Sequence, residues 1–199
     1  QRFDYHREIT SDTFFSGAGF HPSYFHAHNF KYIRGNINND YFVLTIMCSP
    51  NDTNTSDYYV WKRDASNNWV YLLKNIGISN YEFGYNTQGI LYNHFYMNSG
   101  ESNGSSYTSM TNPIVHDLSN NVISELNVPG WGTSYSYQSL DVCDDFAVVG
   151  NRLDYNTPNG TTGVVYIFLR RSDNHFGLGT GPKYNPNMVV YNNNTNNTE

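Results

Sequence analysis

Three histidines near the N-terminus are the residues whose types and spacing suggest metal chemistry. They are His21, His26 and His28. His26 and His28 are two residues apart, so both imidazoles would project from one face of an extended segment. Neutral imidazole is a good ligand for zinc and copper. No carboxylate follows at a useful spacing, and we therefore expect surface or interface histidines, with a zinc or copper site as the alternative.

Catalytic patterns are the second kind of chemistry to consider. The chain has no Gly-x-Ser-x-Gly elbow, no His-Glu-x-x-His motif and no phosphate-binding glycine loop. Cys48 and Cys143 have no histidine close to them in the repeat pattern. They lie two repeats apart, and because a disulfide needs Cα atoms within about 7 Å, we expect them to be unpaired. The adjacent carboxylates Asp144 and Asp145 would point apart on a strand or turn. We therefore expect a protein that is not an enzyme.

Polar loops carry candidate glycosylation sites. The sequons at Asn51, Asn54, Asn103 and Asn159 all fall between two predicted strands, where an acceptor would be exposed. Their positions favour an extracellular or surface-displayed protein.

Tyrosine is abundant, with 18 copies in the chain. Tyrosine rings among Asn and Ser can stack on sugar rings or fill a protein interface, and they can equally pack between sheets. The set considered for glycan binding is Tyr58, Tyr59, Tyr71, Tyr107, Tyr135, Tyr137 and Tyr155.

Composition narrows the class of protein. The 199 residues are 14% charged and 17% aromatic, with a net charge of -6. An acidic chain without a basic run does not favour nucleic acid as a partner. No apolar stretch approaches the roughly 20 residues that span a bilayer, so we expect no membrane insertion. The profile is typical of an all-β domain.

The elements that must position these residues recur at a spacing of about 53 residues. Ser66, Ser119 and Ser172 open similar turns one step apart. The same step relates the segments 42–44, 95–97 and 148–150, and also 30–32 and 83–85, with a further copy at 189–191. The pattern predicts three four-stranded antiparallel repeats.

The predicted organisation has three parts. Residues 1–29 form a capping or docking segment, residues 30–191 form the β-repeat domain, and residues 192–199 form a disordered Asn/Thr tail. The repeats span 30–82, 83–135 and 136–188, and no helix longer than a turn is expected. The predicted strands are 30–33, 41–47, 58–62 and 69–73, then 83–85, 90–97, 114–118 and 122–126, then 137–142, 146–149, 164–169 and a weak one at 176–178.

The third repeat resembles a known family. Its segment Asp144-Asp145-Phe146-Ala147-Val148-Val149-Gly150, a polar loop, and Gly163-Val164-Val165-Tyr166-Ile167-Phe168 are similar to the FG-GAP-like blades of integrin-type β-propellers. A degraded version lies in the first repeat, and the second repeat matches poorly. The resemblance implies four-stranded blades and an extracellular adhesion or scaffold role.

The same resemblance suggests calcium as a ligand, because some blades of that family bind calcium through an Asp/Asn loop. The nearest candidates here are Asp154, Asn156 and Asn159, but their spacing differs from the family loop and from an EF-hand. We therefore expect a solvated turn and no cofactor.

Three blades do not close a propeller ring, because propellers need at least four. The chain is then part of a longer one, or copies assemble into a homo-oligomer or filament, or the fold is a β-trefoil or another β-sandwich. The leading hypothesis is a non-catalytic extracellular structural or adhesive module. The alternatives are a glycan-binding, lectin-like domain and a metal-dependent enzyme that uses the N-terminal histidines.

Two structural predictions follow from the 53-residue step. Phe42, Phe95 and Val148 should occupy equivalent buried positions on inner strands, together with Val60, Val165 and Ile167. The segment Val189, Val190 and Tyr191 should be an orphan strand, which pairs with residues 1–29 or, preferably, inserts into a neighbouring subunit as an assembly strand.

Overall fold

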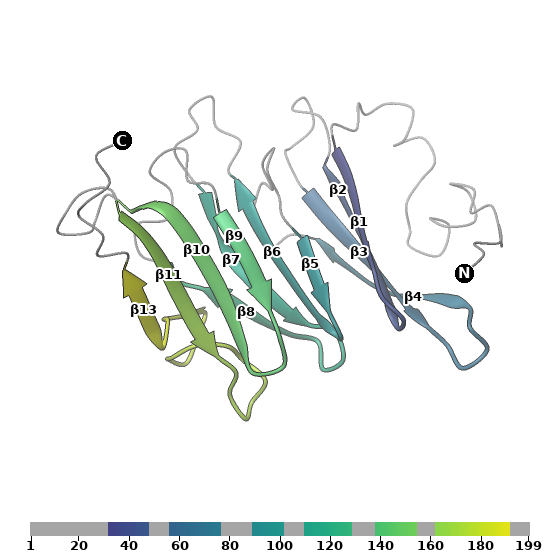
Figure 1. The fold of residues 1–199 in the computed structure, drawn as a ribbon. Coiled ribbons are helices and arrows are strands. Elements are labelled where there is room, and N and C mark those ends of the chain that lie inside the picture. Colours follow the sequence, from purple (N-terminus) through teal and green to yellow (C-terminus); the bar gives the residue numbers. More distant parts are fainter. Residues whose placement is uncertain are drawn as a thin grey trace, which may run out of the picture.

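The structure is a computed structural model, and it describes residues 32–47, 56–76, 89–101, 110–128, 138–154 and 162–191. These residues form an all-β fold of three sheets, and none of them is helical (Figure 1). No described segment is a helix long and apolar enough to cross a bilayer. The N-terminal histidines His21, His26 and His28, the four glycosylation sequons, Asn156, and the predicted segments 1–29 and 192–199 lie outside the described residues.

Sheet 1 and four of the five strands of sheet 2 come from consecutive parts of the chain. Sheet 1 contains β1 (Tyr32–Ile37), β2 (Tyr41–Met47), β3 (Ser56–Arg63) and β4 (Trp69–Ile76), all antiparallel and paired in chain order. Sheet 2 has the order β12-β8-β7-β6-β5. It contains β5 (Gly89–Tyr92), β6 (Phe95–Glu101), β7 (Met110–Asp117), β8 (Val122–Leu126) and the short β12 (Lys183–Tyr184), which joins β8 in parallel.

Sheet 3 has the order β13-β11-β10-β9 and is antiparallel throughout. Its strands are β9 (Gln138–Val142), β10 (Phe146–Asp154), β11 (Thr162–Leu169) and β13 (Met188–Tyr191). Figure 1 shows the three sheets stacked in the order 1, 2, 3, with sheet 2 in the middle.

Asparagine in left-handed backbone conformation forms several tight turns. Asn67 (φ 64°), Asn121 (φ 55°) and Asn174 (φ 66°) lie in corresponding turns after β3, β7 and β11. Asn tolerates positive φ better than most residues because its short amide bonds locally. Asn93 (φ 49°) makes the two-residue turn that separates β5 from β6. The single strand predicted at 90–97 is therefore wrong, and the segment is a hairpin.

Two hydrophobic clusters hold the stack together. Between sheets 1 and 2 the buried side chains are Tyr41, Val43, Tyr58, Val60, Tyr96, Ile114 and Leu118. Between sheets 2 and 3 they include Phe95, Met97, Val115, Leu126, Leu140, Val149, Tyr166 and Phe168. Strands of sheet 2 contribute to both clusters, because alternate side chains point to opposite faces of a sheet.

The chain crosses back to sheet 2 between β11 and β13. Phe176 is buried, and its ring meets that of Phe95 edge to face at 5.4 Å. Its backbone N–H donates to Ser124 Oγ at 3.0 Å, and the Asn127 N–H donates to the Tyr184 carbonyl at 2.8 Å. Residues 176–178, predicted as the fourth strand of the last repeat, make only isolated bridges. They fasten sheet 3 to sheet 2 instead.

Candidate assembly surface

Each sheet contains an inner antiparallel hairpin. These hairpins are β2–β3, β6–β7 and β10–β11, and they occupy equivalent positions in the three sheets. Tyr41, Phe95 and Phe146 are the first residues of β2, β6 and β10. Two residues further along, the directly opposed side chains are Val43 with Val60, Met97 with Val115, and Val148 with Ile167. These pairs are the structural equivalents, and each lies on the face that points away from the preceding sheet.

This alignment corrects the predicted core. Phe42 is only half-buried and lies on the other face of sheet 1, because it is one residue away from Val43 and neighbouring residues point to opposite faces. Phe95 and Val60 are fully buried as predicted. Val148 and Ile167 are half-buried and Val165 is 37% exposed, so the prediction is wrong for this group.

The first two equivalent pairs are fully buried, and the third is only half-buried. Val43 and Val60 pack against sheet 2, and Met97 and Val115 pack against sheet 3. Val148 and Ile167 point away from sheet 2, where the described residues form no further sheet. The contrast is largest at the strand starts, where Tyr41 is 4%, Phe95 0% and Phe146 41% exposed.

We call this free surface the outer face of sheet 3. Its apolar members alternate along the strands with buried residues such as Tyr166 and Phe168, which point toward sheet 2. The pairing of Val165 with Val190 and of Ile167 with Met188 extends the surface onto β13. It consists of Phe146, Val148, Val165, Ile167, Leu169, Met188 and Val190.

The predicted assembly strand forms the edge of the same sheet. β13 pairs with β11 of its own chain, with Val164 opposite Tyr191 and Tyr166 opposite Val189. The expectation of an orphan strand without partners in its sheet is therefore wrong: β13 is the fourth strand of sheet 3. The pattern Val189-Val190-Tyr191 did identify a strand, but its partner depended on the crossing at 170–187. All four residues of β13 are exposed, and its other side has no paired strand among the described residues.

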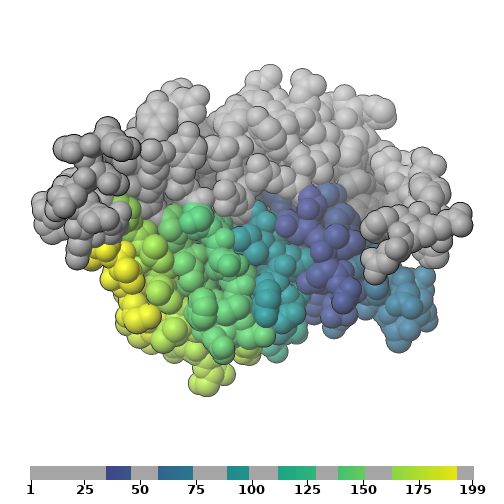
Figure 2. Space-filling model, viewed as in Figure 1, coloured from purple at the N-terminus to yellow at the C-terminus, as the bar shows by residue number. Residues whose placement is uncertain are grey.

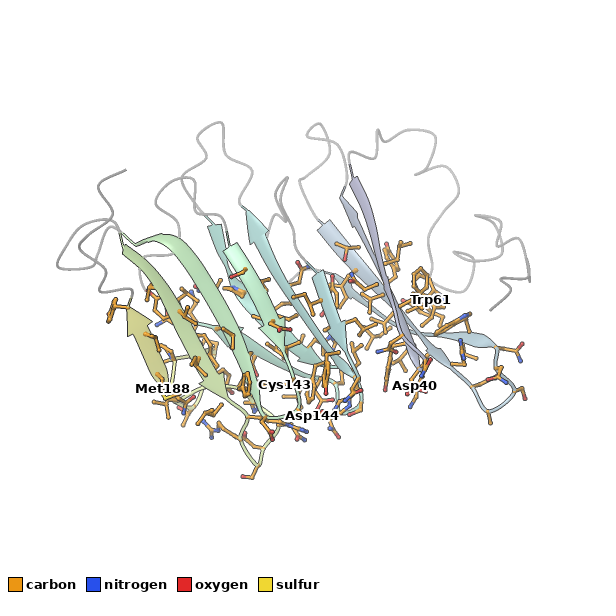
Figure 3. The ribbon with its side chains drawn as sticks, viewed as in Figure 1. Asp40, Trp61, Cys143, Asp144 and Met188 are labelled. Atoms are coloured by element: carbon orange, nitrogen blue, oxygen red, sulfur yellow. The ribbon has the colours of Figure 1, made fainter. Side chains whose placement is uncertain are left out.

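The opposite end of the stack has a different character. Tyr58 and Val60 point toward sheet 2, so Tyr59 and Trp61 lie on the far face of sheet 1. They are 0% and 3% exposed, and the Trp61 ring stacks on Phe42 at 5.4 Å between centroids. Figure 3 places Trp61 and Met188 at opposite ends of the molecule. In Figure 2 the last strand lies at one end of the molecule. On the far face of sheet 1 Tyr59 and Trp61 are buried and Phe42 is half-buried, whereas the outer face of sheet 3 presents exposed apolar side chains at Phe146 and Val165.

Hydrogen bonds connect the turns at one end of all three sheets. Asn38 Nδ2 donates to the Asn93 carbonyl at 2.7 Å, and Asn93 Nδ2 donates to the Asp144 carboxylate at 3.2 and 3.3 Å. Asp144 therefore bonds the neighbouring turn, and both it and Asp145 are exposed. Figure 3 shows Asp144 and Asp40 at this end of the stack. The arrangement orients consecutive sheets relative to one another.

A buried histidine lies between sheets 1 and 2. His116 Nε2–H donates a hydrogen bond to Asn121 Oδ1 at 3.0 Å. Nδ1 is therefore unprotonated and accepts a hydrogen bond from the Tyr58 hydroxyl at 2.7 Å. Burial lowers the pKa of His116 below its ordinary value of 6.5, although the bond to Asn121 and the Asp117 carboxylate act in the opposite direction. Both ring nitrogens have structural partners.

Asp117 organises the turn after β7. Burial raises the pKa of this carboxyl, but hydrogen bonds from Asn120 and Ser119 outweigh burial and hold it below 3.8. Arg170, which follows β11, approaches its Oδ2 at 3.9 Å and also lies 4.7 Å from the Phe95 ring centroid. The side chains of this cluster serve turn formation and the contact between sheets 2 and 3.

The remaining predicted site residues divide into two groups. His21, His26, His28, Asn51, Asn54, Asn103, Asn156 and Asn159 lie outside the described residues. Asp154 is the last residue of β10, and the described part of the chain contains no cluster of three metal-ligating side chains. Tyr58 and Tyr59 are fully buried, which removes them from the set proposed to stack on sugars. Cys143 has a free thiol.

Comparison with known proteins identified no relatives. No family model, curated protein or solved structure matches the chain.

Proposed function

We propose that this chain is a non-catalytic structural or adhesive module, made of propeller-blade-like repeats, that joins further β-sheets through sheet 3. One observation carries the proposal. Among the described residues twelve large hydrophobic side chains are exposed, and seven of them lie on the strands of sheet 3: Phe146, Val165, Leu169, Met188, Val189, Val190 and Tyr191. Five of these seven, Phe146, Val165, Leu169, Met188 and Val190, lie on the outer face of sheet 3. Such a concentration on one face is typical of an interaction site.

The open edge adds to this argument. No described strand pairs with the outer side of β13, beside the apolar face, and edge strands of this kind pair readily with other chains. The described strand carries no lysine, proline or bulge, which are the features that usually block edge pairing. An extracellular setting agrees with the low charge and with the loop sequons.

The chemistry of the buried ionisable groups also favours a structural role. His116 and Asp117 are two of the buried ionisable residues in the described part of sheet 2, and their polar atoms bond Tyr58, Asn121, Ser119 and Asn120. These bonds leave the pair no free group directed toward a substrate.

Sedimentation velocity of the intact chain over a wide concentration range tests the proposal. We expect a sedimentation coefficient that rises with concentration as copies associate. A single monomeric species at every concentration would contradict self-assembly and would leave a place within a larger propeller as the only form of this function.

Truncation is a poor test in this protein. Removing residues 187–199 deletes β13 and exposes the edge of β11, so loss of assembly and damage to sheet 3 would coincide. Point substitutions on exposed positions avoid this difficulty.

A further inference from the structure

The equivalent positions of the three hairpins indicate what the free surface is suited to contact. Val43–Val60 and Met97–Val115 are each covered by the next sheet of the stack. Val148–Ile167 is the same kind of opposed aliphatic pair on the same face, and the chain provides no further sheet among its described residues. Continuity with two existing interfaces therefore predicts that another β-sheet covers this surface.

Open head-to-tail stacking does not supply that sheet. It would place the outer face of sheet 3 against the far face of sheet 1 in the next copy. On that far face Tyr59 and Trp61 are already buried within a single chain, whereas Phe146 and Val165 of the outer face are exposed. The outer face of sheet 3 is thus the more open of the two end faces, and the same face of a second copy is the matching apolar partner.

We propose that the outer face of sheet 3 packs against the same face of a second copy, in a two-fold symmetric sheet-on-sheet dimer. This proposal specifies the partner in the assembly proposed above and rests on it. Two twisted sheets pack face to face about 10 Å apart when both faces are apolar. A two-fold axis uses one patch twice, so the face needs only to be self-complementary.

The distribution of charge fits such a contact. The central strands β10 and β11 present Phe146, Val148, Val165, Ile167 and Leu169 to this face. The exposed carboxylate of Asp141 is opposite Val148 on β9, the strand at the margin of the sheet. Among the side chains that the structure describes on this face, the charge of Asp141 thus lies at the margin and the centre is apolar, as in protein interfaces generally.

The size of the surface predicts the strength of the dimer. Four strands at about 4.8 Å spacing make a face about 19 Å wide, and their lengths of 5, 9, 8 and 4 residues average about 21 Å at about 3.3 Å per residue. The resulting area of about 400 Å² is about half of the roughly 800 Å² per partner of a standard interface. We therefore expect a weak dimer in reversible exchange with monomer.

The test compares matched substitutions in the intact chain by sedimentation equilibrium. Val165→Glu places a charge in the centre of the face, and Val70→Glu places the same charge at an exposed valine of β4 in sheet 1. We expect Val165→Glu to raise the dissociation constant by about a hundredfold, because an unpaired carboxylate would be buried. Val70→Glu should leave it unchanged.

An edge variant separates this contact from strand pairing. Val189→Lys with Tyr191→Lys charges β13, and both residues point away from the outer face because they oppose the inward Tyr166 and Val164. The proposal expects this variant to dimerise like the wild type. If Val165→Glu still dimerises and the edge variant is monomeric, the copies associate through strand pairing. That result would overturn the face-to-face contact and would leave self-assembly intact.

Cross-linking gives a second readout that tolerates a loss of stability in Val165→Glu. Val165→Cys should be linked between copies by a short bis-maleimide reagent, because the facing sheets are about 10 Å apart and a direct disulfide needs Cα atoms within about 7 Å. Val70→Cys is the control and should remain uncross-linked beyond the background set by Cys48 and Cys143. Equal cross-linking of the two variants would overturn the proposal, and a wild type that is monomeric throughout would overturn both this inference and self-assembly.

Discussion

The Tyr58 hydroxyl lies 2.7 Å from His116 Nδ1 and joins sheet 1 to sheet 2 through a buried hydrogen bond. Both side chains are buried, and their rings also meet edge to face at 5.9 Å. The bond is one of the few polar contacts within an otherwise apolar interface, together with the 2.6 Å contact between Thr45 Oγ1 and Tyr96 Oη. These contacts hold the two sheets in one relative position.

Replacing Tyr58 by Phe tests this bond. The substitution keeps the ring but leaves His116 Nδ1 buried without its donor, and an unsatisfied buried acceptor costs about 1–3 kcal/mol. We expect a reduction of that size in the free energy of unfolding measured by urea denaturation. The matched control is Tyr92→Phe, because Tyr92 is exposed and should change stability very little. Equal effects of the two substitutions would argue against the bond.

The free energy of unfolding should depend on pH through the protonation of His116. Its pKa is lowered in the folded protein by burial, so the unfolded chain binds a proton more readily. Stability contributed by the neutral imidazole is therefore complete above about 6.5 and declines as pH falls through the lower folded pKa. Tyr58 contacts the ring, and the Asp117 carboxylate acts on it electrostatically and opposes the shift. Urea denaturation from pH 7.5 to 5 measures the decline, which His116→Gln should reduce.

The Asp117 carboxylate should cause a separate decline in the free energy of unfolding at more acidic pH. Its folded pKa is held below 3.8 by hydrogen bonds from Asn120 and Ser119. The stability contributed by the ionised carboxylate is present above about 3.8 and is lost as pH falls below that value. Asp117→Asn should weaken this acid transition while the decline due to His116 remains. An unchanged acid transition in this variant would contradict the assignment.

The equivalence of Phe95 and Phe146 gives a matched pair of core predictions. Phe95→Ala empties a fully buried aromatic site between sheets 2 and 3 and should cost about 3–5 kcal/mol. Phe146→Ala, at the equivalent but exposed position, should change monomer stability by roughly 0.5 kcal/mol or less. Thermal and urea unfolding at concentrations that favour the monomer measure both. Similar losses at the two positions would contradict the view that only one of them is covered.

The turn asparagines predict a simple backbone effect. Asn67 has φ 64° and is exposed, so its main contribution is tolerance of the left-handed region. Asn67→Ala should cost about 1 kcal/mol because a Cβ without local hydrogen bonds disfavours this conformation. Asn67→Gly should be tolerated because glycine adopts positive φ freely. The comparison needs only the two melting temperatures and a wild-type reference.

The local patterns of the sequence determined the class of fold and several elements. Apolar alternation and Asn-rich turns predicted strands at 41–47 and 122–126, which coincide with β2 and β8. The hairpin within 90–97 was missed, because Asn93 and His94 lie inside an apolar run and their turn depends on positive φ at a single residue. Strand propensity is a short-range property, so it identifies strands better than their ends.

Tertiary structure alone decided which surfaces are covered. A 53-residue step aligns Phe42 with Phe95, whereas the folded hairpins align Tyr41 with Phe95, and a shift of one residue moves a side chain to the other face of its sheet. The segment Val189–Val190–Tyr191 is a strand by its composition, but β11 became its partner only because residues 170–187 fold back across sheet 2. Burial depends on these long-range contacts, and spacing along the chain does not contain them.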